Sequence, residues 1–218
     1  MQDVYNSKKH MADLGCGSGI LSIIMKENAG FEGSITCLDT SENALECAKM
    51  NLQLYGKVEE DGLELKEVDL VDLWFPISGS PEATKSQKQV NFYDKISEDL
   101  GFPQKFDLIT CNPPWIPASY ITGNQSSMTH NFDLDNAVYD PKEKFLISCL
   151  NFAKFHLDPD NGEMLLVYSD LAVNLGLQEP NRIHDLASKF GFCKVTLIDQ
   201  TSMPLTKNLH DPLKMIKK

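Results

Sequence analysis

Short apolar runs alternate along the chain with segments whose apolar residues recur at helical spacing. The runs have the length of buried strands, and several end at glycine or at a residue that caps helices. This pattern predicts helices at residues 19–28, 42–55, 141–156 and 181–190. It predicts strands at residues 9–14, 33–39, 63–70, 106–111, 162–170 and 193–199. Such alternation is typical of an α/β fold, a doubly wound and mostly parallel sheet with helices on both faces.

Two details refine this outline. The first expected helix carries Ile20, Ile23 and Ile24 on one face, and Ser41 stands where the N-cap of the second helix is expected. Residues 76–105 break the alternation, because they are polar and contain Gly, Ser and Pro, with a short helix expected at 92–100. We interpret the whole chain, 1–218, as a single domain with an insertion at 76–105.

The charge balance narrows the choice of partners. The formal net charge is −11, the basic residues are dispersed, and proteins that grip a nucleic acid backbone usually cluster Lys and Arg. Protein or small-molecule partners are therefore favoured over nucleic acid, while the oligomeric state is not indicated. No apolar run has the length of a membrane span. The six cysteines form no CxxC pair and have no histidine at zinc spacing, which favours reduced thiols in a cytoplasmic protein without a metal site.

The stretch Asp13-Leu-Gly-Cys-Gly-Ser-Gly19 joins the first expected strand to the first helix. Its glycines allow a tight turn and let a ligand approach the backbone. The spacing is G-x-G-x-G, since residue 20 is Ile, whereas dinucleotide-binding loops have G-x-G-x-x-G. This difference disfavours a nicotinamide oxidoreductase. Asp39 ends the second expected strand and is placed to accept hydrogen bonds from ribose hydroxyls.

A second motif, Asn112-Pro113-Pro114-Trp115, follows the fourth expected strand. Together with the glycine loop and Asp39, it makes the chain resemble the class I S-adenosylmethionine-dependent methyltransferases. Within them it is similar to the HemK-like and "small" methyltransferases, which modify planar nitrogens. The resemblance runs over essentially the whole chain and implies S-adenosylmethionine as cofactor. The cofactor-binding residues that it implies are Asp13, Gly15, Cys16, Gly17, Gly19, Asp39, Thr40, Asp69, Leu70 and Asn112.

The residues of the second motif suit methyl transfer to a planar NH₂. The Asn112 side-chain oxygen and the Pro113 carbonyl can accept both N–H hydrogens, and Trp115 offers a face for stacking. Pro113 and Pro114 stiffen the loop and bring no competing N–H donor. Alignment of two bound reactants supplies about 7–11 kcal/mol, so a strong general base is not required. We therefore expect Asn112, Pro113, Pro114 and Trp115 to form the transfer site.

The acceptor stays open at this stage. In the HemK-like group the motif usually ends in Tyr and acts on a glutamine amide, whereas other relatives methylate the exocyclic amine of adenine in RNA or DNA. A non-catalytic, methyltransferase-like partner subunit is the alternative from another class. The resemblance also implies an N-terminal cover over the cofactor and a last strand, and we expect this chain to lack both.

Overall fold

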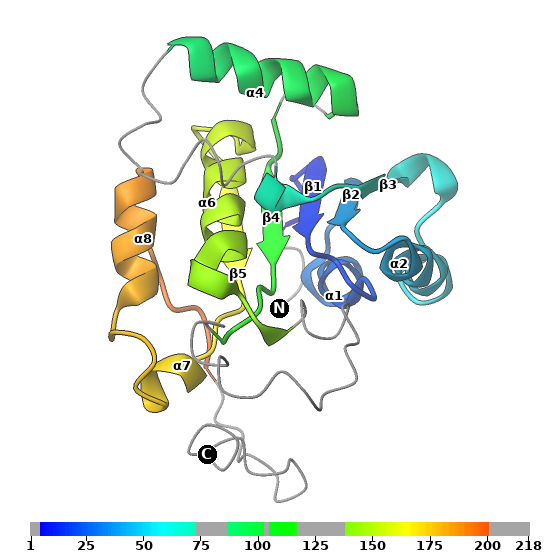
Figure 1. The fold of residues 1–218 in the computed structure, drawn as a ribbon. Helices are drawn as coiled ribbons and strands as arrows, with labels where there is room; N and C mark the ends of the chain where they lie inside the picture. Colours follow the sequence, from blue (N-terminus) through cyan, green and yellow to red (C-terminus); the bar gives the residue numbers. More distant parts are fainter. Residues whose placement is uncertain (1–4, 73–86, 103–104, 117–137, 201–218) are drawn as a thin grey trace, which may run out of the picture.

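The computed structural model describes residues 5–72, 87–102, 105–116 and 138–200, with the backbone alone for 87–93 (Figure 1). The strands are β1 (His10–Leu14), β2 (Ser34–Asp39), β3 (Leu63–Glu67), β4 (Leu108–Cys111) and β5 (Glu163–Leu166). The helices are α1 (Ile20–Ala29), α2 (Glu42–Leu54), α4 (Gln87–Leu100), α6 (Lys144–His156), α7 (Leu171–Asn174) and α8 (Arg182–Phe190). Two 3-10 turns, η1 (Glu60–Gly62) and η4 (Pro141–Glu143), precede β3 and α6.

The five strands form one parallel sheet in the order β3-β2-β1-β4-β5. Leu14 at the end of β1 pairs with Leu38 of β2 on one side and with Cys111 of β4 on the other. Parallel strands end at a common edge, so the loops that follow β1, β2 and β4 leave the sheet together. The prediction of a doubly wound parallel α/β sheet is confirmed.

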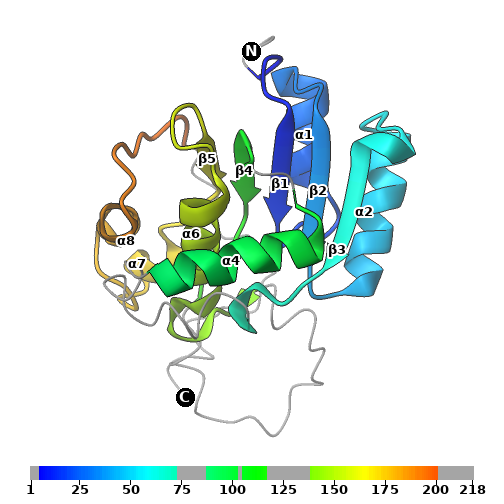
Figure 2. The same cartoon turned by 90° about the horizontal axis from the view of Figure 1, so that it is seen from above.

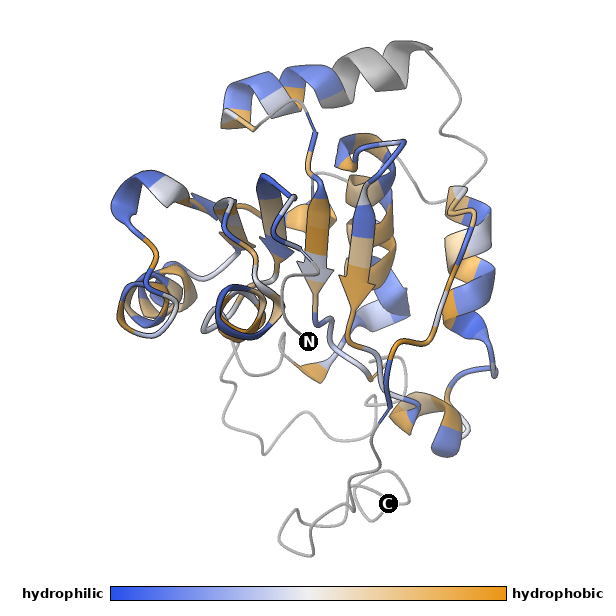
Figure 3. Cartoon of the chain, turned by 180° about the vertical axis from the view of Figure 1, so that it is seen from behind, coloured by the Kyte–Doolittle hydropathy of each residue, from blue (hydrophilic) through white to orange (hydrophobic). Residues whose placement is uncertain are grey.

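Alternating residues of the central strands feed two separate cores. Met11 and Ile35 pack with the face that α1 and α2 cover, while Leu14 and Ile109 pack with Phe152 of α6 on the other face. Figure 2 shows α4 and α6 on the opposite side of the sheet from α1. Figure 3 shows the strands at the centre of the sheet in the hydrophobic colours. This two-sided burial is what the near-continuous apolar character of β1 and β4 predicts.

Helix α8 covers α6 rather than the sheet. Leu186 and Phe190 of α8 are buried against Leu146 and Leu150 of α6. Helix α4 lies within the segment expected to be an insertion and starts five residues earlier than the helix expected at 92–100. Its Ile96 and Leu100 pack against the core beneath α6, and its Ser97 hydroxyl lies 3.2 Å from His156 Nδ1. No helix in the described part of the chain is long and apolar enough to cross a membrane.

The sequence pattern was wrong at the edges of the sheet. β3 ends at Glu67 instead of residue 70, and residues 193–199 form no strand. A strand requires a hydrogen-bonded neighbour, and within the described residues nothing pairs with 193–199. Leu197 and Ile198 are accordingly exposed. Alternation alone therefore did not identify a strand here.

Two helix starts also differ from expectation. Pro141 was expected to open a helix, but Lys142 and Glu143 adopt left-handed φ angles of 61° and 57°, so α6 begins at Lys144. In α1 the expected apolar face is partly outside the core, since Ile20 is 53% exposed. The residues of α1 that are buried are Ser22 and Met25. Ser22 occupies the sheet side because it meets a buried carboxylate of β1, described below.

Gly33, just before β2, lies very close to the backbone just before β1. A Cβ at Gly33 would lie 2.2 Å from the backbone oxygen of Lys9, whereas a Cβ at Gly62 would meet nothing closer than Val58 at 3.6 Å. We expect Gly33→Ala to lower the free energy of unfolding by about 1–3 kcal/mol, because backbone cannot move aside as a flexible side chain can. Urea denaturation followed by circular dichroism measures it. Gly62→Ala is the matched control, and equal stability of the two variants would contradict the packing argument.

Candidate active site

The loop after β1 turns sharply, and its glycines enable the turn. Gly15 and Gly17 adopt φ angles of +62° and +52°, which residues with a side chain rarely do. A Cβ at Gly15 would stand 2.7 Å from the Phe145 ring of α6, while a Cβ at Gly17 would meet nothing within 4 Å. Gly15 therefore lets the loop pass close to α6, and Gly17 leaves open space above the backbone. Gly19, also with positive φ, begins α1 and packs against Ala48.

Asp39 at the end of β2 fixes this loop from the neighbouring strand. Its Oδ2 accepts the Gly17 N–H at 2.9 Å, and its Oδ1 accepts the Ser41 N–H at 3.0 Å. The Cys16 N–H is also held, by the Leu38 carbonyl at 3.0 Å. Asp39 is only half-buried, and each carboxylate oxygen can accept a further hydrogen bond. Asp39 therefore keeps acceptor capacity for a ligand.

Asp13 has a different position from the one expected of a cofactor contact. It is 1% exposed and accepts hydrogen bonds from the Ser22 hydroxyl of α1 at 2.6 Å and the Thr110 hydroxyl of β4 at 2.9 Å. Burial raises the pKa of Asp13 to about 6, against the two hydroxyl hydrogen bonds that lower it. The carboxylate thus ties β1, α1 and β4 together beneath the loop.

Cys16 is the buried side chain within the loop. A hydrogen bond with the Cys37 thiol of β2 and burial both raise the pKa of Cys16 well above its usual range. The thiol therefore stays protonated at neutral pH and is a poor nucleophile. Its side chain packs beneath the backbone of the loop.

The segment after β3 matches the cofactor contacts implied for Asp69 and Leu70 less well. Leu70 is 2% exposed and belongs to the core beneath α6. Asp69 is exposed, and its Oδ1 accepts the N–H groups of Val71 and Asp72 at 2.8 and 3.1 Å. Asp69 therefore caps the turn that follows β3. Thr40 is exposed between Asp39 and the N-cap residue Ser41, whose hydroxyl accepts the Ala44 N–H at 3.3 Å.

The second motif leaves the sheet beside the glycine loop. Since Leu14 pairs with Cys111, the residues that follow them, Gly15 and Asn112, emerge next to each other from the same edge. Asn112 is exposed, Pro113 is buried and Trp115 is 39% exposed. The Cys111 carbonyl is occupied, since it accepts the Val167 N–H at 2.9 Å. The motif is thus clamped on the β5 side and presents Asn112 and Trp115 outward.

Beyond Trp115 the chain is anchored to the segment before α6. The Ile116 N–H donates to the Val138 carbonyl at 3.2 Å, and the Asp140 N–H donates to the Ile116 carbonyl at 2.8 Å. Asp140 in turn caps α6, because its two oxygens accept the N–H groups of Phe145 and Leu146 at 2.8 and 3.0 Å. Burial raises the pKa of Asp140 to about 6, although these hydrogen bonds lower it.

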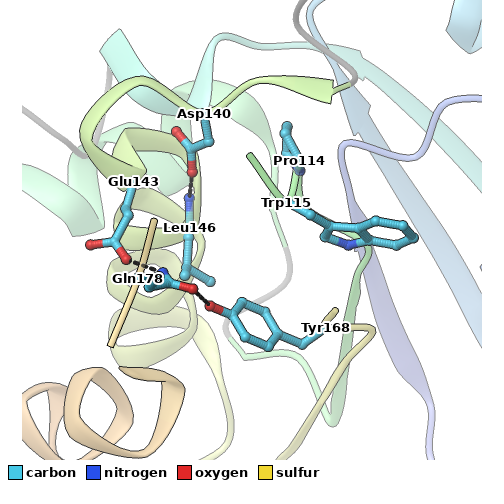
Figure 4. Close-up of a pocket in the computed structure, with 7 residues that line it drawn as sticks. All are labelled: Pro114, Trp115, Asp140, Glu143, Leu146, Tyr168 and Gln178. Carbon is cyan, nitrogen blue, oxygen red and sulfur yellow. Dashed lines mark hydrogen bonds between the residues drawn. The ribbon is translucent and has the colours of Figure 1, made fainter. Parts of the chain in front are cut away.

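A pocket lies against this motif, and sequence reasoning missed most of its residues. Figure 4 shows Pro114 and Trp115 on one side and a chain of hydrogen-bonded side chains, Tyr168, Gln178 and Glu143, on the other. The Tyr168 hydroxyl donates to Gln178 Oε1 at 2.5 Å, and Gln178 Nε2 donates to Glu143 Oε1 at 2.5 Å. Asp140 and Leu146 complete the lining. One sequence feature could have pointed to Tyr168. It lies two residues after β5, at the edge of the sheet where the other strands also end.

Glu143 is the centre of that hydrogen-bonded chain. Arg182 Nε lies 2.9 and 3.0 Å from its two oxygens, and Arg182 Nη2 also pairs with it. Burial raises the pKa of Glu143, but hydrogen bonds from Arg182 and Gln178 outweigh this and lower it overall. Glu143 is therefore ionised and its charge is matched. Among the described residues, no group of His, Cys, Asp and Glu has the arrangement of a metal site.

A parallel sheet of this order, with a glycine loop after β1 and an acidic residue ending β2, agrees with the class I methyltransferase fold that the sequence resemblance implied. Residues 1–73 match the family model described as "Methyltransferase small domain". The matched residues 1–73 thus carry the methyltransferase small domain, in agreement with the methyltransferase resemblance that the sequence predicted. The narrower likeness to the HemK-like group stays a prediction.

Curated relatives carry methyltransferase names. A demethylmenaquinone methyltransferase of Leptospira interrogans is 40% identical over 127 residues, which are 53% of this chain and 49% of the relative. Ribosomal RNA large subunit methyltransferase G of Shewanella frigidimarina is 29% identical over 117 residues, 52% of this chain and 26% of the relative. The chain spans about half the length of the Leptospira relative.

Among solved structures, a ribosomal protein L11 methylase from Lactobacillus delbrueckii subsp. bulgaricus has a TM-score of 0.45 and 17% identity, over 83% of this chain and 59% of that one.

The buried Asp13 carboxylate predicts a pH-dependent stability. Its pKa is about 6 when folded and near 3.8 when unfolded, so its favourable contribution is complete below about 3.8 and is lost as the pH rises through 6. Asp13→Asn removes this titration and keeps an acceptor for Ser22. We expect the difference in unfolding free energy, variant minus wild type, to rise by about 1–2 kcal/mol between pH 5 and 7.5. Urea denaturation at both pH values measures it, and a constant difference contradicts the assignment.

Proposed function

We propose that this domain transfers a methyl group from S-adenosylmethionine to a planar NH₂ group held by Asn112 and Pro113. The observation that carries the proposal is the strand register, because pairing of Leu14 with Cys111 brings the glycine loop and the Asn112 loop out of the sheet side by side. A donor lying on the glycine loop and an acceptor at Asn112 are then neighbours.

The cofactor has residues that suit its parts. The open space above Gly17 suits the methionine part, and the spare acceptor capacity of Asp39 suits the ribose. When bound, the cofactor supplies an electrophilic methyl group on a sulfonium. Asn112 and Pro113 would accept the two N–H hydrogens of the acceptor and so turn its nitrogen lone pair toward that methyl group. Trp115 would stack on the flat group, and the nitrogen would shed one proton after the transfer.

The protein amide of a glutamine-type side chain, or a small molecule, is the acceptor we favour, on the basis of the net charge of −11. A base amine in RNA is the second candidate, and the likeness to a protein named ribosomal RNA large subunit methyltransferase G favours it. A non-catalytic role beside a partner subunit is the alternative from another class.

Cofactor binding is tested with S-adenosylhomocysteine by isothermal titration calorimetry. We expect the wild type to bind and Asp39→Ala to bind at least about tenfold more weakly, since a charged acceptor of two hydroxyls is lost. Asp61→Ala is the matched control, because it removes the same charge at an exposed position of η1. Equal affinity of the two variants would place the ribose elsewhere, and no binding by the wild type would sink the proposal.

Transfer is tested with a methyl-labelled cofactor and cell extract, followed by separate protease and nuclease digestion. Asn112→Ala should lose about 100-fold or more of the transfer rate, far more than any loss of affinity for S-adenosylhomocysteine, because it fails to align the acceptor. Label released by protease supports the amide acceptor. Label released by nuclease, with steep loss as salt rises, supports the base amine. Cofactor binding without transfer into any fraction, with a stoichiometric partner co-purified, would support the non-catalytic role.

A further inference from the structure

Phe145, the second residue of α6, lies against the loop that follows β1. A Cβ at Gly15 would stand 2.7 Å from Phe145 Cζ, and 3.4 and 3.6 Å from its two Cε atoms. Because Cζ is the nearest atom, the ring points its tip at Gly15 and does not lie flat on it. The ring and a side chain at residue 15 therefore exclude each other, so the close approach of α6 to the loop depends on this glycine.

Further contacts hold Phe145 in this position. Its N–H donates to Asp140 Oδ1 at 2.8 Å, within the cap of α6. Its side chain packs against the core cluster that contains Leu14, Ile109 and Phe152. Phe145 is only half-buried, however, so part of the residue stays accessible. The ring is thus anchored by the core and the helix cap without being enclosed by them.

The ring stands where the glycine loop and the second motif leave the sheet together. Leu14 pairs with Cys111, so Gly15 and Asn112 emerge side by side. A methyl group that passes from a donor on the glycine loop to an NH₂ group at Asn112 must cross between these two residues. Phe145 contacts Gly15 from the α6 side and therefore borders that crossing.

An aromatic ring at this point suits the charge of a sulfonium. A sulfonium has no N–H or O–H, so its charge cannot be bound through a hydrogen bond that it donates. Aromatic rings attract such cations, and more strongly where water is excluded. The buried carboxylates of the site, Asp13 and Asp140, already accept hydrogen bonds from protein groups. A leucine at position 145 would fill similar space without attracting a cation.

We propose that Phe145 contacts the sulfonium of S-adenosylmethionine, so that the domain distinguishes the charged methyl donor from its neutral product, S-adenosylhomocysteine. This inference rests on the proposed function, because that function places the cofactor on the glycine loop. When the methyl group leaves, the sulfur keeps the electron pair of the broken S–C bond and becomes a neutral thioether. The attraction of the ring is then lost, which favours release of the product.

The test compares the affinities of S-adenosylmethionine and S-adenosylhomocysteine by isothermal titration calorimetry, which requires no acceptor and no turnover. In Phe145→Leu the affinity for S-adenosylmethionine, relative to that for S-adenosylhomocysteine, should fall about fivefold from the wild-type ratio. Phe145→Met should give the same fall, so the result does not depend on how well one replacement packs. A ring that only supports the loop would weaken the binding of both ligands by the same factor.

Phe155→Leu is the matched control, because Phe155 is also a half-buried residue of α6 that packs against the same core cluster. It lies near the end of α6, where Leu157 pairs with Phe106 before the start of β4. The helix between the two phenylalanines is about 15 Å long. This variant should keep the wild-type ratio of affinities. Urea denaturation verifies that each variant is folded.

Equal weakening of both ligands in Phe145→Leu and Phe145→Met overturns the inference and leaves the proposed function standing. An equal change of the ratio in Phe155→Leu also overturns it, because the position of the ring then has no special effect. If the wild type binds neither ligand, the inference and the proposed function both fail. A fall of the ratio confined to the Phe145 variants supports the inference, even where no methyl transfer to an acceptor is detected.

Discussion

The whole site depends on one buried carboxylate. Asp13 is enclosed in the sheet, and a buried charge is tolerated only where hydrogen bonds satisfy it. Ser22 of α1 and Thr110 of β4 supply those bonds. Ser22 lies in the helix that follows the glycine loop and Thr110 lies in the neighbouring strand, so these bonds hold α1 and the end of β4 against the end of β1.

The positions of the other site residues follow from the pairing of β1 with its two neighbouring strands. Leu14 lies between Leu38 and Cys111, so the residues after these three strands share one edge of the sheet. Asp39 then holds the loop through Gly17, and the Cys111 carbonyl holds the chain that leads to Tyr168. A parallel sheet of this kind gathers residues that are far apart in sequence, which explains why one edge combines a cofactor loop, a proline-rich loop and a pocket.

The sequence predicts the parts of this site that follow local rules. A glycine loop after a strand, an acidic residue ending the next strand and two consecutive prolines after a third are all visible without a structure, and β1, β2 and β4 lie close to where periodicity puts them. The role of each residue in and beside the glycine loop is harder to predict from the sequence. Asp13 has the same sequence context whether it faces a ligand or the core, and only the pleat decides that it meets Ser22.

Tertiary contacts that sequence does not encode locally account for the failures. Glu143, Gln178, Arg182 and Tyr168 come from separate segments, each carrying an ordinary polar residue with no motif around it. The run at 193–199 has the composition of a strand, but pairing is a property of two segments, and its alternation could not reveal a missing neighbour. Pro141 likewise favoured a helix start, whereas contacts made by Glu143 impose another backbone.

The unusual backbone at this wall of the pocket indicates that specific side-chain contacts hold it in place. Lys142 and Glu143 are consecutive left-handed residues with side chains, and Asn181, beside Arg182, is a third. Each such residue costs about 1–2 kcal/mol, so the conformation persists only where other contacts impose it. The pairing of Glu143 with Arg182 joins the two strained sites directly. The pair neutralises Glu143, and Glu143 in turn holds the Gln178 amide, whose oxygen accepts the Tyr168 hydroxyl hydrogen. The strained backbone is thus tied to the hydrogen-bonded side chains that line the pocket, because Glu143 lies at the centre of both.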